Sequence, residues 1–269
     1  EIYETVTAKL LPTPKKSHYT FNLRDLSKVF QGMLMAKKGQ LLQGPPQLLR
    51  LWFHEQFRVF RDRLVNTEDR AWFTDLCGTC LKPHVEHFEN SDALTDSKAV
   101  SEVMWGDFLT REDKVYQEIE QPTKLGELFT ETLEEYNITY PTQMHLVFFQ
   151  DAIMHCARIS RVLAQPRGNS LLVGVGGSGR KSLANLASFM AGCKTISIEI
   201  TRGYGMSEWR EDLKKILMTA GAENKKVVFL FSDTQVVEEG FLEDINNILN
   251  SGDVPNLYEP EETERIVNM

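Results

Sequence analysis

The 269-residue sequence has no apolar run approaching the roughly 20 residues that a membrane-spanning helix needs, so we expect no membrane partner. It also lacks an excess of positive charge. The formal net charge is −8, which argues against general binding to nucleic acid. No signal-peptide pattern opens the sequence. The chain begins at Glu1 without an initiator methionine and stops at Met269 just after a charged patch, so we expect an excerpt from a longer protein.

Only four cysteines are present, which limits metal and disulfide chemistry. Cys77 and Cys80 form a CxxC pair with two histidines nearby, a combination that zinc and redox sites share. No second ligand pair follows at zinc-finger spacing, and no strand–helix–strand pattern surrounds the pair, so we expect both residues to be structural. Cys156 and Cys193 stand in apolar, helix-like surroundings typical of small core residues, and the set fits a reducing compartment.

The first 85 residues have the three- and four-residue spacing of apolar side chains that indicates helices, and they show no strand pattern. Prolines and glycines separate the helical segments: Pro12 and Pro14 follow the first, and Gly39 ends the second. We therefore expect an all-helical domain here. Its helices are expected at residues 1–11, 19–38, 48–64 and 68–82.

Residues 86–141 are less regular and are typical of a connector between two domains. Acidic and serine residues dominate its first part, a short ordered piece is expected at 103–105, and a helix is expected at 125–136. Prolines bracket that helix.

From residue 142 to 269, strand patterns alternate with helical patterns, which predicts a parallel sheet flanked by helices. The apolar run at 227–231 suits a strand that is buried on both faces. The expected fold class is therefore α/β, preceded by the helical domain. The expected strands are 170–173, 195–200 and 227–231, and the expected helices are 144–162, 182–191, 207–220 and 241–249.

A glycine-dense turn follows the first expected strand and precedes a helix. Glycines let the backbone curl so that its N–H groups point at an anion, and the helix N-terminus adds partial positive charge. This order predicts a phosphate-binding loop, with an ordinary glycine-rich turn as the alternative. The candidate binding residues are Gly174, Val175, Gly176, Gly177, Ser178, Gly179, Arg180, Lys181 and Ser182.

The loop departs at two positions from the pattern G-x-x-x-x-G-K-[ST], although its two glycines are correctly spaced. Arg180 holds the lysine position and can still reach the β- and γ-phosphates, with a planar fork in place of a point charge. Lys181 holds the Ser/Thr position, and an ammonium group cannot coordinate Mg²⁺ as a hydroxyl does. Ser182 lies one residue later, where a helical rotation of about 100° directs it elsewhere. We expect ATP or ADP to bind here.

An acidic residue ends the apolar run at 227–231, as in enzymes with such loops. There an Asp holds the Mg²⁺ water shell and a neighbouring Glu activates the attacking water. Asp233 is thus the candidate metal residue, with a plain strand-end turn as the alternative. Thr234 stands in the place of the Glu and is not a usable base, while Glu238 and Glu239 fall on the following loop. Together with Lys181, this predicts little or no hydrolysis and no catalytic residue.

Two other functions remain open on these residues. The chain could be an active phosphate-loop enzyme, such as an ATPase, a GTPase or a small-molecule kinase. The missing hydroxyl, the missing Glu and the helical N-terminal domain disfavour it. The chain could also be a structural module that binds nothing, in which case replacing Arg180 by alanine leaves nucleotide affinity unchanged.

Several separate stretches resemble dynein heavy chains, in family order. Similarity to the fourth AAA+ module of the axonemal type lies in GVGGSGRKSLANLASFMAG, ITRGYGMSEWREDLKKIL, FLFSDTQ and FLEDINNILNSGDVPNLY. Similarity to the helical lid of the third module lies in LLPTPKKSHYTFNLRDLSKVFQGML. Axonemal relatives carry the same loop arginine and lack the same glutamate. They usually have glutamine where this chain has Lys181. The resemblance is weakest over 86–135.

This resemblance implies further roles. Arg24, in the FNLRD stretch, would be the sensor-2 arginine that faces the third module's nucleotide, with a solvated helix arginine as the alternative. Val147, ahead of the loop, would line the adenine side. The remaining catalytic parts of the fourth module would follow Met269, so the chain would not be a complete ATPase alone.

The resemblance also implies partners and a place in the cell. Neighbouring AAA+ modules of the same heavy chain would pack around the core in a ring. Dynein intermediate and light chains, and microtubules, would be reached through parts absent here. The expected location is the cytoplasm and cytoskeleton, in the axoneme of a cilium, and the expected process is microtubule-based movement.

Overall fold

The computed structural model describes residues 1–37, 39, 44–87, 103–110, 114–121 and 124–268. Its contacts divide the chain into two compact units, Glu1–Leu125 and Gly126–Met269. Within the described ranges, no helix is both long enough and apolar enough to span a membrane.

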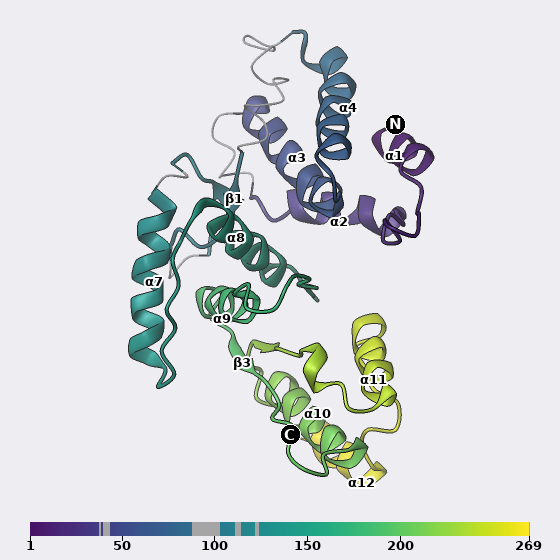
Figure 1. The fold of residues 1–269 in the computed structure, drawn as a ribbon, viewed down its shortest axis with the longest axis vertical. Coiled ribbons are helices and arrows are strands. Elements are labelled where there is room, and N and C mark those ends of the chain that lie inside the picture. The colour runs from purple at the N-terminus through teal and green to yellow at the C-terminus, as the bar shows by residue number, and fades with distance from the viewer. Residues whose placement is uncertain (38, 40–43, 88–102, 111–113, 122–123, 269) are drawn as a thin grey trace. The chain divides into compact units, whose positions relative to one another are not determined.

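In its described residues, the first unit is built mainly from helices, with a short 3₁₀ turn and an antiparallel pair of short strands (Figure 1). Asn22 caps the second helix by accepting hydrogen bonds from the backbone of Arg24 and Asp25, and the Asp25 side chain returns a bond to the Asn22 backbone. The elements are α1 (Ile2–Lys9), α2 (Leu23–Met33), α3 (Pro45–Val59), η2 (Arg61–Arg63), α4 (Thr67–Val85), β1 (Trp105–Gly106) and β2 (Gln117–Glu118).

Aromatic side chains from α3 and α4 fill the core of the first unit. Phe57 and Phe73 pack edge to face at 6.3 Å between ring centroids, and Phe60 stacks on Phe73 at 5.8 Å. The antiparallel pair β1–β2 adds a smaller cluster, in which Trp105 packs near Tyr116 and the Tyr116 hydroxyl donates to the Glu55 carboxylate. The ordered piece expected at 103–105 is thus confirmed. The described residues of the expected connector up to Leu125 belong to this unit, whereas 88–102, 111–113 and 122–123 lie outside the described residues.

Cys77 and Cys80 both lie on α4. Cys77 is buried, and burial raises the pKa of its thiol well above the usual value. A thiol held in its neutral form is a poor nucleophile and a poor metal ligand. Among the described residues, no cluster of three or more His, Cys, Asp or Glu side chains is arranged to hold a metal ion.

The second unit joins helices to a parallel two-stranded sheet, in which Lys194 pairs with Val227 and Ile196 with Phe229. Helices expected at 182–191, 207–220 and 241–249 are present with slightly different ends. The elements are α7 (Leu125–Thr139), α8 (Gln150–Ala164), α9 (Arg180–Met190), β3 (Lys194–Ile196), α10 (Met206–Gly221), β4 (Val227–Phe229), η4 (Asp233–Gln235), α11 (Glu239–Asn250) and α12 (Pro260–Val267).

Several expectations for this unit are wrong. The strands expected at 195–200 and 227–231 are shorter, and the residues of β4 are half-buried, not buried on both faces. Glu239 begins α11 and does not lie on a loop. The apolar run 170–173 is not a strand: Leu171 is 88% exposed and Val173 is 85% exposed. A strand needs a hydrogen-bonding neighbour and covered faces, and in the described sheet β4 pairs only with β3. The helix expected from 144 begins only at Gln150, because the Asn137 side chain bonds both the N–H and the carbonyl of Met144 at 2.7 and 2.9 Å and holds that backbone outside a helix.

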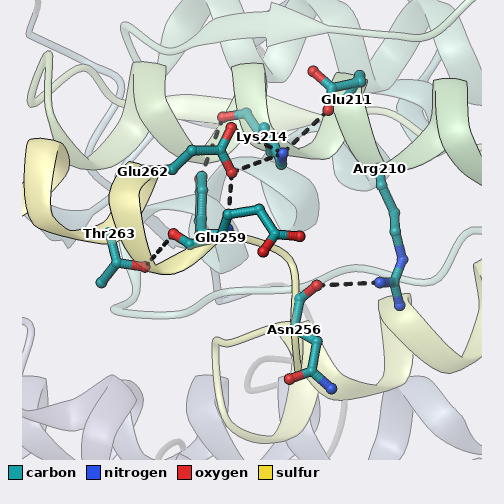
Figure 2. Close-up of polar contacts among 8 residues, drawn as sticks. Arg210, Glu211, Lys214, Asn256, Glu259, Glu262 and Thr263 are labelled. Carbon is teal, nitrogen blue, oxygen red and sulfur yellow. Dashed lines mark hydrogen bonds and ion pairs between the residues drawn. The ribbon is translucent and has the colours of Figure 1, made fainter.

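A salt bridge from Lys214 to Glu262 ties α12 to α10, and Lys214 also pairs with Glu211 on its own helix (Figure 2). The Lys214 ammonium lies 2.9 Å from a Glu262 oxygen and 3.1 Å from a Glu211 oxygen. Glu262 also accepts a hydrogen bond from the Glu259 backbone N–H at the start of α12. That backbone bond and the lysine together lower the pKa of Glu262 below its usual value. None of the α12 residues is buried, so these polar contacts carry much of its attachment.

We expect α12 to loosen on acidification. Because the Glu262 pKa is lowered in the fold, its ionised form stabilises the fold above the unfolded pKa of about 4.3, and this contribution disappears as pH falls through the lower folded value. Amide hydrogen exchange of α12, corrected for intrinsic rates, should show weaker protection at pH 3.5 than at pH 7. Glu262→Gln should remove most of that difference, whereas Glu264→Gln should keep it; equal pH dependence in both variants would contradict the assignment.

Candidate functional site

The glycine-rich loop leads directly into α9. Gly177 and Gly179 have φ values of +76° and +77°, in the left-handed region that other residues adopt only with strain. Gly174 lies close under the turn, since a Cβ there would stand 3.3 Å from the Ser178 hydroxyl oxygen. These three positions explain why the loop needs glycine.

The first turn of α9 presents backbone donors. Gly179 is its N-cap, and no side chain caps the helix. In the described part of the chain, the N–H groups of Arg180, Lys181 and Ser182 have no hydrogen-bond acceptor. Donors arranged in this way, with the positive end of the helix dipole behind them, suit an anion such as a phosphate.

Packing between α8 and α9 holds this helix end in place. Leu183, Leu186 and Ala187 on α9 are buried. The Cys156 sulfur on α8 lies 3.8 Å from the Met190 sulfur and 4.0 Å from the Leu183 carbonyl oxygen. The thiol pKa of Cys156 is raised to about 12 by burial, so it acts as a neutral core residue, as the sequence predicted.

Arg180 lies back across the loop. Its guanidinium donates a hydrogen bond to the Val175 carbonyl oxygen at 3.2 Å, and its Cδ would be 3.6 Å from a Cβ on Gly174. Lys181 next to it is exposed, and Ser182 is half-buried. The loop thus carries two adjacent cations, one folded over it and one directed to solvent.

Asp233 opens the 3₁₀ turn η4 beyond β4, and its carboxylate is exposed. One of its oxygens accepts the Thr234 backbone N–H at 3.0 Å. The Thr234 hydroxyl lies 2.9 Å from the Ser232 hydroxyl. Within the described residues, no hydrogen bond joins Asp233 to the glycine-rich loop.

Sequence reasoning missed Gln235. This residue is 8% exposed, and its amide bridges the segments that leave β3 and β4. The only sequence signal is its place two residues after Asp233, where a polar side chain follows an apolar strand.

Two other predicted site residues lie on exposed surfaces. Val147 precedes α8 and is 85% exposed. Arg24 lies in the first turn of α2, in the first unit, with an exposed side chain that makes no hydrogen bond or ion pair in the described residues. Within the described residues of the second unit, no hydrogen bond joins Val147 to the glycine-rich loop.

Comparison with known families matches residues 144–269 to the P-loop containing dynein motor region D4, and residues 1–95 to an AAA+ lid domain. The two matches follow each other along the chain as the helical and α/β regions do. Dynein axonemal heavy chain 1 of Mus musculus is 52% identical over 269 residues, which cover 99% of this chain. The chain belongs to the axonemal dynein heavy chains. It is a segment of their motor region, and the P-loop of that region implies a nucleotide-binding site.

Similarity extends to other axonemal dyneins. Dynein axonemal heavy chain 2 of Homo sapiens is 48% identical over 271 residues, and Dynein axonemal heavy chain 6 of Homo sapiens is 45% identical over 277 residues. The chain spans about 6% of the length of these dynein relatives. The fold is that of an AAA+ core with a helical lid domain.

Proposed function

We propose that this dynein segment binds ATP or ADP at a degenerate P-loop, and that the bound nucleotide has a structural or regulatory role with little or no hydrolysis. The observation that carries this proposal is the uncapped N-terminus of α9, reached through a loop with two left-handed glycines. Backbone donors from Val175 to Lys181 would hold the phosphates. The Arg180 guanidinium would exchange its bond to the Val175 carbonyl for the β- and γ-phosphate oxygens.

Weak hydrolysis is supported by the residues at two positions. Lys181 has no lone pair to offer Mg²⁺ when charged, and its charge opposes the metal. Thr234 bonds its neighbour Ser232 and cannot take a proton from water as a carboxylate would. General-base and metal effects each contribute factors of roughly 10² to 10⁴ to such reactions, so losing both would slow hydrolysis by several orders of magnitude.

Magnesium would bind beside Asp233. The exposed carboxylate keeps one oxygen free of the Thr234 N–H, which suits a hard cation or its water shell. When bound, Mg²⁺ supplies charge neutralisation of the phosphates. The protein residues provide the loop donors, the Arg180 fork and the Asp233 carboxylate.

The three regions of the chain would have different roles in the motor. Residues 1–85 would be the lid of the third AAA+ module, with Arg24 directed to that module's nucleotide. Residues 86–141 would connect it to the core of the fourth module at 142–269, where Val147 would lie on the adenine side. The bound nucleotide would determine how neighbouring modules of the same heavy chain pack against this core.

The axonemal relatives support a location in the cytoskeleton of the cilium and a part in microtubule-based movement. Intermediate chains, light chains and microtubules would be bound by other parts of the heavy chain. Neither a membrane nor a nucleic acid is a proposed partner.

Calorimetric titration of the purified chain with ATP and ADP, each with Mg²⁺ and with EDTA, tests this proposal. We expect binding of at least one nucleotide. Absence of binding by both would leave a structural module as the function. Binding followed by rapid release of phosphate would favour the alternative, an active P-loop ATPase.

Restoring the hydroxyl that P-loops usually carry at position 181 should increase the effect of Mg²⁺ on ATP affinity. In Lys181→Thr, we expect the gain in ATP affinity on adding Mg²⁺ to rise about tenfold, since a ligand is added and an opposing charge is removed. Lys181→Ala removes the charge without adding a ligand and is the matched control. Equal gains in the two variants would show that the hydroxyl does not reach the metal.

A further inference from the structure

We infer that Gln235 positions Asp233 for the metal–nucleotide complex, by fixing the turn η4 to the end of β3. The inference rests on the proposed nucleotide site and adds a residue to it. Gln235 would touch neither the phosphates nor the metal, so it is a positioning residue.

The Gln235 amide makes four hydrogen bonds. Its oxygen accepts the Ser232 backbone N–H at 2.7 Å and the Ser232 hydroxyl at 3.0 Å. Its nitrogen donates to the Ser197 hydroxyl at 3.2 Å and to the Ile198 carbonyl at 2.5 Å. The amide thus uses both ends, and it does so while almost fully buried.

These bonds join two chain segments that are 37 or 38 residues apart in sequence. Ser197 and Ile198 directly follow β3, and Ser232 follows β4, so the amide closes the carboxyl ends of the two parallel strands. In open α/β sheets, ligands bind at this edge. Gln235 therefore lies at the same edge of the sheet as Asp233, where a metal–nucleotide complex would bind.

The same turn fixes the direction of Asp233. The backbone N–H of Gln235 donates to the Ser232 carbonyl at 2.9 Å, and that of Val236 donates to the Asp233 carbonyl at 3.2 Å. Among the described residues, the Asp233 carboxylate accepts a hydrogen bond only from the adjacent Thr234 N–H. With the amide bonds in place, a shift of the Asp233 backbone would break hydrogen bonds of Gln235, of which the one to the Ile198 carbonyl is buried and costly to leave unmade.

No apolar residue can replace this amide. A leucine at 235 has a similar size, but it leaves the Ser232 N–H and the Ile198 carbonyl without their partner. A glutamate keeps the acceptor for Ser232 and places a second oxygen against the Ile198 carbonyl oxygen. Both changes should release the turn while leaving the glycine-rich loop intact.

The test compares ATP affinity with and without Mg²⁺ in the purified chain. We expect the unmodified chain to gain about tenfold in affinity from Mg²⁺, the size of one charge-assisted contact. Gln235→Leu should lose this gain and keep its affinity in EDTA. Asp233→Asn should behave in the same way. The exposed Gln150→Leu is the matched control and should keep the full gain.

The outcomes separate the two levels of the proposal. A full gain in Gln235→Leu overturns the positioning role while nucleotide binding stands. No gain in the unmodified chain also overturns it, because Asp233 then holds no metal. No nucleotide binding at all removes the proposed function itself. A loss of affinity in EDTA as well would show a general structural role and contradict positioning.

A milder variant covers the case in which Gln235→Leu does not fold. Ser197→Ala with Ser232→Ala removes two of the four amide bonds and keeps the bonds to the Ser232 N–H and the Ile198 carbonyl. We expect this double variant to lose roughly half of the tenfold gain, counted on a logarithmic scale. An unchanged gain would contradict the inference.

Discussion

Trp209→Ala should lower the free energy of opening around β4 by about 3–5 kcal/mol, as truncation of a fully buried aromatic side chain does. The Trp209 indole is fully buried. It stacks on Phe241 with ring centroids 4.5 Å apart and planes 9° apart, and it lies 5.2 Å from the ring of Phe231. The side chain therefore joins α10, α11 and the segment that follows β4.

The polar end of the same side chain adds to this effect. The indole N–H donates to the buried Asp244 carboxylate at 3.0 Å, and the Arg210 guanidinium lies 3.8 Å from the same oxygen. Removing the indole leaves that carboxylate with a weaker set of partners. Trp209→Phe keeps part of the stacking but loses the N–H donor and one of the two fused rings, so we expect it to cost about 1–3 kcal/mol.

Native-state hydrogen exchange measures both effects. The Leu230 amide, which donates to the Ile196 carbonyl at 2.8 Å across the sheet, reports on β3 and β4. Amides of α3 belong to the first unit and serve as an internal control that should not change. A cost below about 1 kcal/mol for Trp209→Ala would show that this stack is not the centre of the unit's core.

Arg180→Ala should weaken nucleotide binding about tenfold to a hundredfold, the loss expected for charge-assisted contacts to phosphate. The side chain is partly exposed and bonds only the Val175 carbonyl in the described structure, so unfolding should change little. Calorimetry with ATP and ADP measures the affinity, and thermal unfolding verifies the fold.

Two variants make the Arg180 result specific. Arg180→Lys restores the residue that P-loops usually carry and should recover most of the affinity. Arg202→Ala removes an exposed arginine of the same unit and should have no effect. If Arg180→Ala binds nucleotide as tightly as the unmodified chain, the structural-module interpretation is favoured over the nucleotide site.

Much of the fold could be predicted from local patterns. Apolar spacing located α2, α9, α10 and α11, because each of these helices buries one face within its own unit. The apolar pattern at 227–231 located β4, which pairs with β3 and packs Val227 and Phe229 against the aromatic cluster of Trp209, although its residues are only half-buried. The apolar spacing within each of these segments is enough to predict it.

Other elements depend on contacts with distant residues, which a local sequence pattern does not predict. The run at 170–173 has the composition of a strand, but composition does not supply the neighbour that a strand must bond. The helix expected at 144 is delayed by the side chain of Asn137, which lies several residues upstream. At the site, glycine spacing located the loop, whereas Gln235 acts through residues some 37 positions away and left no periodic signal.

The central claim is that the site holds nucleotide without turning it over. The most direct measurement is the nucleotide content of the purified chain, followed by its rate of phosphate release from ATP with Mg²⁺. The account predicts that ADP or ATP is retained and that release is negligible. Clear Mg²⁺-dependent release that Asp233→Asn abolishes would contradict it, and a base such as Glu238 or Glu239 would then have to act in place of Thr234.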